Sequence, residues 1–218
     1  QRKKMFQIPY APSLVPGHFV RRYKRFFADV TLDDGTLVTA HCANTGSMKG
    51  LLNEGSRVWL RPNNNPKRKL KWTWEIASEG ETLVGINTSL PNQLVTESIQ
   101  AEEIESLLGY QSVKREVKYG ENSRIDVFLS DHKEGRPSCY VEVKNVTLAR
   151  GNQALFPDAV TARGLKHLKE LENMVREGHR AMMLYVVQRG DAQSFAPAED
   201  IDPAYAKGLR SALETGVE

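Results

Sequence analysis

Two short stretches, SRIDVFL at residues 123–129 and YVEVKNV at residues 140–146, decide the fold of the second half of the chain. In each stretch apolar residues alternate with polar ones, which is the pattern of a strand with one buried face. Asp126 lies opposite the apolar face of the first strand. Glu142 and Lys144 share the polar face of the second, about 6.5–7 Å apart. Three ionisable groups on adjacent central strands would be costly to bury without a compensating partner.

The segments around these strands predict a mixed sheet flanked by helices. The predicted elements are, in order, a helix at 97–108, strands at 113–119, 123–129 and 139–148, a helix at 158–177 and a strand at 181–187. The second helix is expected to start at the N-cap Asp158, to end before Gly178, and to bury the stripe Val160, Leu165, Leu168, Leu171 and Val175. This α-β-β-β-α-β order is typical of an α/β domain.

The first part of the chain predicts a small β-barrel with an OB-like fold. Its strand-like runs are residues 25–32, 36–42, 57–61, 71–76 and 82–86, and Asp33-Asp34-Gly35 is a strong hairpin turn. The turn at Pro91-Asn92 is the expected boundary, which gives an OB-like domain at residues 1–90 and an α/β domain at residues 91–218.

A metal site would explain the charged residues on the central strands. Asp126, Glu142 and the backbone carbonyl of Val143 offer hard oxygen ligands to Mg²⁺ or Mn²⁺. Such a cation lowers the pKa of a bound water and polarises a scissile phosphate. Lys144, which we expect to be half exposed, would orient that water. The alternative is that Asp126 and Glu142 only form ion pairs with Lys144 and Arg124 on an exposed sheet face.

Glu116 is a candidate accessory acid. If the hairpin before residue 129 is centred on Glu121, paired residue numbers sum to 242 and Glu116 faces Asp126. A shift of one residue would place Glu116 on the other face.

Basic residues concentrate in two segments of the first domain, although the net charge is only +3. They interleave with aromatic residues, as in sequence-tolerant nucleic-acid binding, and are Arg21, Arg22, Lys24, Arg25, Lys67, Arg68 and Lys69. We expect Phe26 and one tryptophan to lie in the barrel core. Arg163 and His167, four residues apart, could hold a phosphate. A solvated basic face is the alternative for both groups. Residues 41–48 are either a ligand-facing loop or a tight turn fixed by Gly46.

Several classes of protein are disfavoured. No run approaches the ~20 apolar residues that span a bilayer, and residues 1–10 are basic without the apolar core of an export signal. Cys42 and Cys139 are far apart and are expected to be buried thiols. We therefore expect a cytoplasmic protein without a membrane partner.

Asp126 and the Glu142-Val143-Lys144 triplet, in this element order, resemble the PD-(D/E)xK nuclease superfamily, although Ile125 replaces the usual preceding proline. A longer set of motifs is more specific and resembles the SfsA (sugar fermentation stimulation protein) family: RYKRF at 22–26, HCANTGSM at 41–48, SRID at 123–126, EVK at 142–144 and FPDAVTARG at 156–164.

The resemblance runs from about Leu14 to the end of the chain. It implies an OB-like domain joined to a PD-(D/E)xK-like domain, and non-specific DNA binding linked to the regulation of sugar, notably maltose, metabolism. It also favours a functional role for Arg163 and implies a further strand beyond residue 218.

The sequence therefore predicts a non-specific DNA-binding protein with a Mg²⁺-dependent nuclease centre in which Asp126, Glu142, Lys144 and Glu116 are catalytic. The alternative is a non-catalytic DNA-binding regulator of sugar metabolism with a vestigial nuclease site. Whether RNA is also bound, and the oligomeric state, are left open. A sugar-processing enzyme has no legible sugar-binding pattern in its favour.

Overall fold

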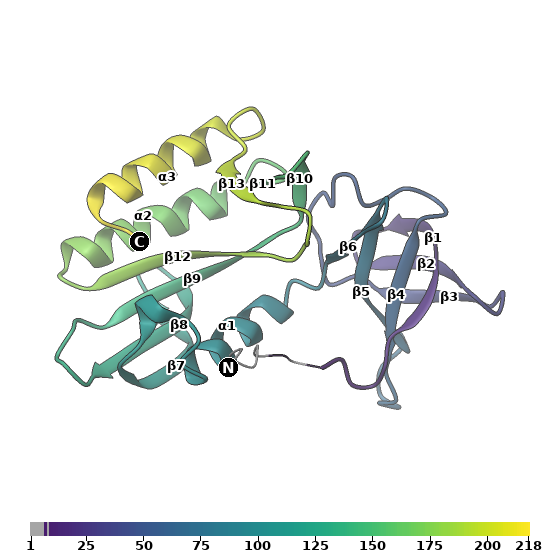
Figure 1. Ribbon diagram of the computed structural model, residues 1–218, viewed down its shortest axis with the longest axis horizontal. Helices are drawn as coiled ribbons and strands as arrows, with labels where there is room; N and C mark the ends of the chain where they lie inside the picture. The colour runs from purple at the N-terminus through teal and green to yellow at the C-terminus, as the bar shows by residue number, and fades with distance from the viewer. Residues whose placement is uncertain (1–6, 8) are drawn as a thin grey trace, which may run out of the picture.

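The chain folds into two lobes, which a computed structural model describes for residue 7 and residues 9–218 (Figure 1). Most of the basic segment at residues 1–10, which we expect to lack an export signal, lies outside the described residues. No helix in the described part has the length and apolar character needed to cross a bilayer.

The N-terminal lobe is an OB-like barrel, as the sequence predicts. Its six-stranded sheet has the order β3-β2-β1-β4-β5-β6. Pairing of His41 on β3 with Thr73 on β5 closes strands β1 to β5 into the barrel, and β6 pairs with β5 outside this closure. The strands are β1 (Val15–Tyr23), β2 (Phe27–Leu32), β3 (Leu37–His41), β4 (Arg57–Pro62), β5 (Trp72–Glu79) and β6 (Thr82–Gly85). The predicted turn at Gly35, with its positive φ of 87°, joins β2 to β3.

Two details of the barrel differ from the expectation. Strand β1 was not predicted, because Pro16 and Gly17 interrupt its apolar pattern. Phe26 is 51% exposed at the β1–β2 turn, whereas we expected it in the core; Trp74 is the fully buried tryptophan.

The C-terminal lobe is an α/β domain built on a four-stranded sheet of order β12-β9-β8-β7. These strands are β7 (Tyr110–Tyr119), β8 (Ser123–His132), β9 (Cys139–Val146) and β12 (Arg180–Val187). Helices α2 (Ala162–Arg176) and α3 (Pro203–Thr215) lie on one side of the sheet, and α1 (Leu90–Gln100) lies on the other (Figure 1). The central strands are therefore covered on both faces, and Ile125, Val127 and Leu129 are fully buried.

Both predicted helices start at different residues from those expected. Helix α1 begins at Leu90, and Pro91 lies in its first turn, where its missing N–H costs nothing; the predicted 97–108 helix covers only its end and a 3-10 turn at Glu105–Leu107. Helix α2 begins after Thr161, whose side chain accepts a hydrogen bond from the Gly164 N–H, so Asp158 is not the N-cap. Val160 precedes the helix and is 76% exposed, not buried.

A small second sheet and helix α3 were not predicted. Strands β10 (Leu148–Arg150), β11 (Gln153–Phe156) and β13 (Ser194–Pro197) form the sheet, which lies beside the N-terminal lobe (Figure 1). Asp202 caps α3 by accepting a hydrogen bond from the Tyr205 N–H, and Pro203 follows it. An acid followed by proline is a helix-start signal, and Asp202-Pro203 provides it in this sequence.

Side-chain contacts on two sides hold the lobes together. Arg189 after β12, which is buried, forms an ion pair with the partly exposed Glu79 of the barrel at 2.8 Å. On the other side, the Asp158 carboxylate accepts hydrogen bonds from the Ser47 hydroxyl at 2.8 Å and the Met48 N–H at 3.0 Å. These contacts fix the 43–48 loop of the barrel against the entrance to α2.

Candidate active site

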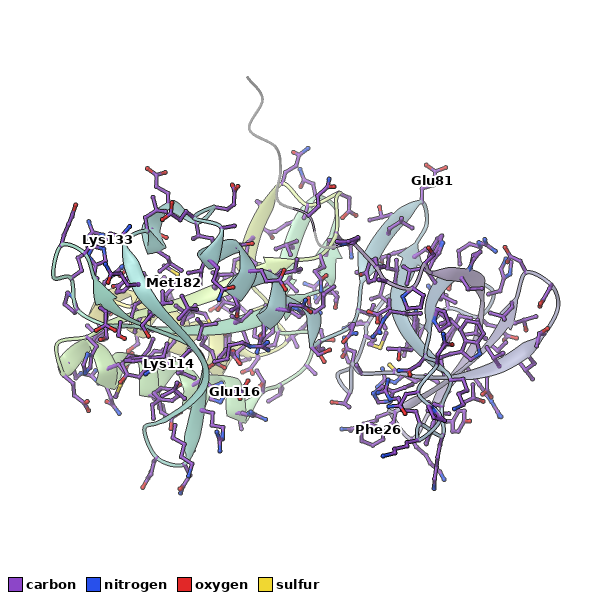
Figure 2. The ribbon with its side chains drawn as sticks, turned by 90° about the horizontal axis from the view of Figure 1, so that it is seen from below. Phe26, Glu81, Lys114, Glu116, Lys133 and Met182 are labelled. Atoms are coloured by element: carbon purple, nitrogen blue, oxygen red, sulfur yellow. The ribbon has the colours of Figure 1, made fainter. Side chains whose placement is uncertain are left out.

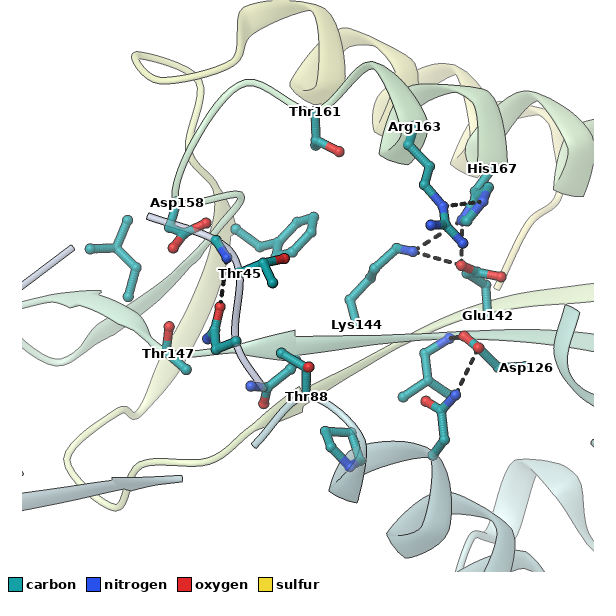
Figure 3. Close-up of a pocket in the computed structure, with 18 of the residues that line it drawn as sticks. Thr45, Thr88, Asp126, Glu142, Lys144, Thr147, Asp158, Thr161, Arg163 and His167 are labelled. Carbon is teal, nitrogen blue, oxygen red and sulfur yellow. Dashed lines mark hydrogen bonds and ion pairs between the residues drawn. The ribbon is translucent and has the colours of Figure 1, made fainter. Parts of the chain in front are cut away.

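A cavity of about 590 Å³ lies between the lobes and takes residues from both. Its charged end holds Asp126, Glu142, Lys144, Arg163 and His167, and its other end holds Thr45, Thr88, Thr147 and Asp158 (Figure 3). Strand β9 crosses its base, so the residues from Glu142 to Thr147 extend from one end to the other.

Asp126 lies where β8 and β9 separate. The ladder between these strands starts at Val127, paired with Val141, and does not include Asp126, the residue before it. Beyond that point its carboxylate accepts a hydrogen bond from the Val143 backbone N–H at 2.7 Å, in place of a strand partner. The other oxygen accepts one from the Asn92 amide at 2.8 Å. Burial, and then the charge of Glu142, raise the pKa of Asp126 above its ordinary value. This carboxylate is therefore costly to ionise without a nearby cation.

Glu142 is 2% exposed and its Oε1 atom has two partners. Lys144 Nζ donates to it at 2.6 Å, and His167 Nδ1 also contacts it. Burial opposes ionisation, but the hydrogen bond to His167 and the charge of Lys144 outweigh it and lower the pKa of Glu142. Lys144 Nζ also lies 3.1 Å from His167 Nδ1. Since one nitrogen cannot donate and accept at once, His167 either donates to Glu142 or accepts from Lys144.

The donor set fits a hard divalent cation that keeps several non-protein ligands. Within the described residues, no three His, Cys, Asp or Glu side chains converge as a metal-binding group. Asp126 and Glu142 would thus need the Val143 carbonyl and water or phosphate oxygens to complete a shell, which is usual for Mg²⁺. Glu142 Oε2 is buried with no hydrogen-bond partner in the described part of the chain. An orphaned buried oxygen of this kind is what a cation would satisfy.

Lys144 is less accessible than expected, because its side chain is 15% exposed. Arg163 lies in the first turn of α2 and reaches the same end of the cavity (Figure 3). Its Nε makes only a long contact of 3.5 Å to His167 Nε2. No carboxylate lies within ion-pair distance of Arg163 among the residues that the structure describes. Its guanidinium is therefore available to an anion.

The structure does not bring Glu116 into this group. The predicted register of the β7–β8 hairpin is present, with Arg115 facing Val127 and Val117 facing Ile125. Glu116 itself has a left-handed φ of 53°, leaves the ladder and is exposed. It lies outside the cavity lining and projects from the C-terminal lobe (Figure 2). The predicted pairing of Glu116 with Asp126 is therefore wrong, because local backbone geometry overrides the register.

The predicted basic residues of the N-terminal lobe also lie outside the cavity. Arg21 forms an ion pair with Asp29 at 2.8 Å. Arg22 donates to the Gly46 carbonyl at 2.7 Å and thereby supports the 43–48 loop. The remainder are exposed, on the β1–β2 turn or on the loop between β4 and β5: Lys24, Arg25, Lys67, Arg68 and Lys69.

Sequence reasoning missed the polar residues at the ends of the cavity. Asn92 lies in the segment we expected to be a turn. Residues 41–48 contain a tight turn at Gly46, since the Asn44 side chain accepts from the Gly46 N–H at 2.9 Å. Asn44 and Gly46 also line the cavity, and whether they face a ligand stays a prediction. Asn145 and Thr147 also line the cavity, and strand alternation gives no signal for them, because it places Asn145 on the face opposite Lys144.

Comparison with known protein families identifies the family of the chain. The model described as "SfsA N-terminal OB domain" matches residues 20–86, and the model described as "Sugar fermentation stimulation protein RE domain" matches residues 89–218. The chain belongs to the SfsA family.

Individual SfsA proteins match over nearly the whole chain. A sugar fermentation stimulation protein homolog of Paramagnetospirillum magneticum is 56% identical over 209 residues, which are 96% of this chain and 88% of the relative. That of Geobacter sulfurreducens is 55% identical over 94% of this chain and 87% of its own. The structure of Pyrococcus furiosus SfsA in complex with Ca²⁺ has a TM-score of 0.88 and 28% identity, and the match covers 98% of this chain and 90% of that one.

Proposed function

We propose that this SfsA protein is a divalent-metal-dependent phosphodiesterase that acts on nucleic acid. The observation that carries the proposal is the pair of carboxylates, the partly buried Asp126 and the buried Glu142, beside Lys144 at one end of the inter-lobe cavity. The Pyrococcus furiosus relative was solved in complex with Ca²⁺, which supports the binding of a divalent cation by this chain. We favour Mg²⁺ or Mn²⁺ as the working ion.

Each charged residue has a definite task in this proposal. Asp126, Glu142 and the Val143 carbonyl would hold the cation, which when bound supplies a more acidic water and a polarised phosphate. Lys144 orients the attacking water and offsets the negative charge that develops on the phosphate. Arg163 binds the non-bridging phosphate oxygens. His167 limits the rotation of Glu142 by contacting Oε1.

The N-terminal lobe contributes binding in this proposal. Lys24, Arg25 and the 67–69 segment are exposed cations that would contact phosphates regardless of base sequence. DNA is the expected partner, in the cytoplasm, and RNA is a second substrate to be compared with it.

The direct test is cleavage of labelled DNA and RNA, each single- and double-stranded, with Mg²⁺, with Mn²⁺ and with EDTA. We expect cleavage with either ion and none with EDTA. Lys114→Ala provides a matched control for Lys144→Ala, because Lys114 is exposed on β7, away from the cavity (Figure 2). Absence of cleavage under every divalent condition would contradict the proposal.

A second candidate is a DNA-binding regulator of sugar metabolism whose nuclease-like site is inactive. One observation favours it: Glu142 Oε1 is already neutralised by contacts to Lys144 and His167 without a metal. Binding of DNA by wild-type protein that never cleaves it would support this candidate.

A further inference from the structure

The geometry points to a nucleobase-binding site at the end of the inter-lobe cavity opposite Lys144 and Arg163, so that the substrate is nucleic acid with an unpaired nucleotide at the scissile phosphate. This inference rests on the proposed function for the position of the phosphate. It adds what lies next to that phosphate and which form of nucleic acid can enter.

The two ends of the cavity differ in their chemistry. Lys144 and Arg163, the only lysine and arginine that line it in the described chain, lie at the end with Glu142 (Figure 3). The opposite end contains Thr45 and Thr147, together with one acid, Asp158. A phosphate is therefore favoured at the first end and disfavoured at the second, where Asp158 is an anion and no lysine or arginine of the described chain lines the cavity.

The end opposite Lys144 and Arg163 has the features that a nucleobase requires. A base is a flat, weakly polar ring with hydrogen-bonding edges, and base sites combine aromatic or apolar surfaces with amide and hydroxyl groups. The apolar surface here comes from Phe156, Leu148 and Leu155, which all line the cavity. The ring of Phe156 packs against Tyr205 at 5.2 Å between centroids, so its position is fixed from behind.

One hydrogen-bond donor in this region, the Asn145 side-chain amide, has no acceptor in the described part of the protein. Asn145 accepts from the Gln188 amide at 2.9 Å through Oδ1, whereas its Nδ2 is buried and has no partner in the described part of the protein. Thr147, only 6% exposed, lines the cavity next to it. A buried donor without an acceptor is unfavourable by itself. A carbonyl or ring nitrogen of a base would satisfy it.

The distance along β9 suits a single nucleotide. Lys144 and Thr147 are three residues apart, which corresponds to roughly 10 Å of extended chain. The cavity volume of about 590 Å³ falls within the roughly 300–1,000 Å³ typical of small-ligand sites. One nucleotide can thus place its phosphate near Lys144 and its base near Thr147.

The N-terminal lobe closes this end of the cavity. Asn44, Thr45 and Gly46 form part of its wall, and Asp158 and Arg22 hold that loop in place. A base in a duplex is paired and stacked, so it cannot enter such a cavity without being extruded from the helix. Single strands, frayed ends and loops meet this condition at little cost.

The first test measures binding without catalysis. Calorimetry compares deoxythymidine 5′-monophosphate with 2-deoxyribose 5-phosphate, which lacks the base, on the wild-type protein in Mg²⁺. We expect the nucleotide to bind at least tenfold more tightly. Affinities within twofold of each other would overturn the base site.

Two variants locate the effect. Thr147→Val and Asn145→Ala should each reduce the ratio of the two affinities by at least threefold. Thr31→Val is the matched control, because Thr31 is a partly buried residue of β2 outside the cavity. An unchanged ratio in both variants would place the base elsewhere and overturn the inference.

The second test uses oligonucleotides of one sequence as a single strand and as a blunt duplex. We expect the single strand to be cut at least tenfold faster, and equal rates would overturn the inference. If nothing is cut but the nucleotide preference is present, the base site stands and the phosphodiesterase proposal fails. If cleavage occurs and the base adds no affinity, the phosphodiesterase stands and the base site fails.

Discussion

The two lobes differ in how they satisfy charged residues. In the barrel, Arg21 pairs with Asp29, Arg57 with Asp33, and Arg61 with the buried Glu75, while Lys24, Arg25 and the 67–69 segment are exposed. In the α/β lobe, the buried Glu142 lies beside the partly buried Asp126 and Lys144, and its Oε2 has no partner in the described residues. Solvated charges and surface ion pairs cost little, whereas buried unsatisfied ones are expensive. The cluster of Asp126, Glu142 and Lys144 is therefore the better indication of function, even though the basic runs of the barrel are more conspicuous in the sequence.

The largest effect is expected from Asp126→Asn, which tests whether the charged cluster of the α/β lobe carries the reaction. The change removes a charge that the cation would neutralise but keeps an amide oxygen for the Val143 N–H. We expect cleavage to fall by at least roughly 10³-fold, with poor Mn²⁺ binding by calorimetry. Asp131→Asn, on the exposed end of β8, is the control and should retain full activity. Normal cleavage by Asp126→Asn would show that the Asp126 carboxylate is not needed for the reaction.

Lys144→Ala separates chemistry from metal binding. Loss of a positioned positive charge should lower cleavage by on the order of 10²–10³-fold. Mn²⁺ should still bind, since Asp126 and Glu142 remain, and oligonucleotide binding should persist through the barrel. Because His167 remains as a partner for Glu142, we expect the protein to stay folded by circular dichroism. A variant that cuts as fast as wild type would mean that Lys144 has no role in the reaction.

Asp158→Ala tests whether the lobes must be held together. It removes the acceptor for both Ser47 and Met48, and hydrogen bonds to a charged group are worth about 2 kcal/mol. We expect a lower melting temperature and reduced cleavage of oligonucleotides. Ser47→Ala, which deletes one of the two bonds, should produce a smaller change in both measurements. Full activity in Asp158→Ala would show that the 43–48 loop is dispensable.

The smallest effects are expected from the exposed cations of the barrel. Lys24→Ala should weaken binding equally for all sequences and reduce the slope of log affinity against log salt by about 1. Arg22→Ala should weaken binding more, because it also releases the Gly46 carbonyl. Fluorescence anisotropy at several salt concentrations gives both slopes. An effect of Lys24→Ala on one sequence alone would contradict non-specific binding.

The sequence predicts the strands of the site well because alternation is a local property. Residues 123–129 and 140–146 fall within β8 and β9, and the hairpin register before them is the expected one. The exception, Glu116, arises from a left-handed backbone at one residue, which no alternation pattern encodes.

Contacts between the lobes could not be predicted in the same way. Asp158 and Ser47 are 111 residues apart, and their hydrogen bond depends on how two separately folded lobes pack. The same holds for the cavity, because Thr45 and Thr147 line it together only after the two lobes have packed. The predicted start of α1 is wrong for a different reason. Proline at 91 favours a turn, but it suits the first turn of a helix equally well.

The hydrogen bond from the Val143 amide to Asp126 has a consequence for measurement. Most amides of a central strand are bound to a neighbouring strand and report only on the stability of the sheet. This one is bound to the carboxylate of the proposed reaction centre. Protonation of Asp126, or arrival of a cation beside it, would change the charge that the amide faces. The nitrogen and proton resonances of Val143 therefore act as a built-in spectroscopic probe of the site, which can be followed without any substrate or turnover.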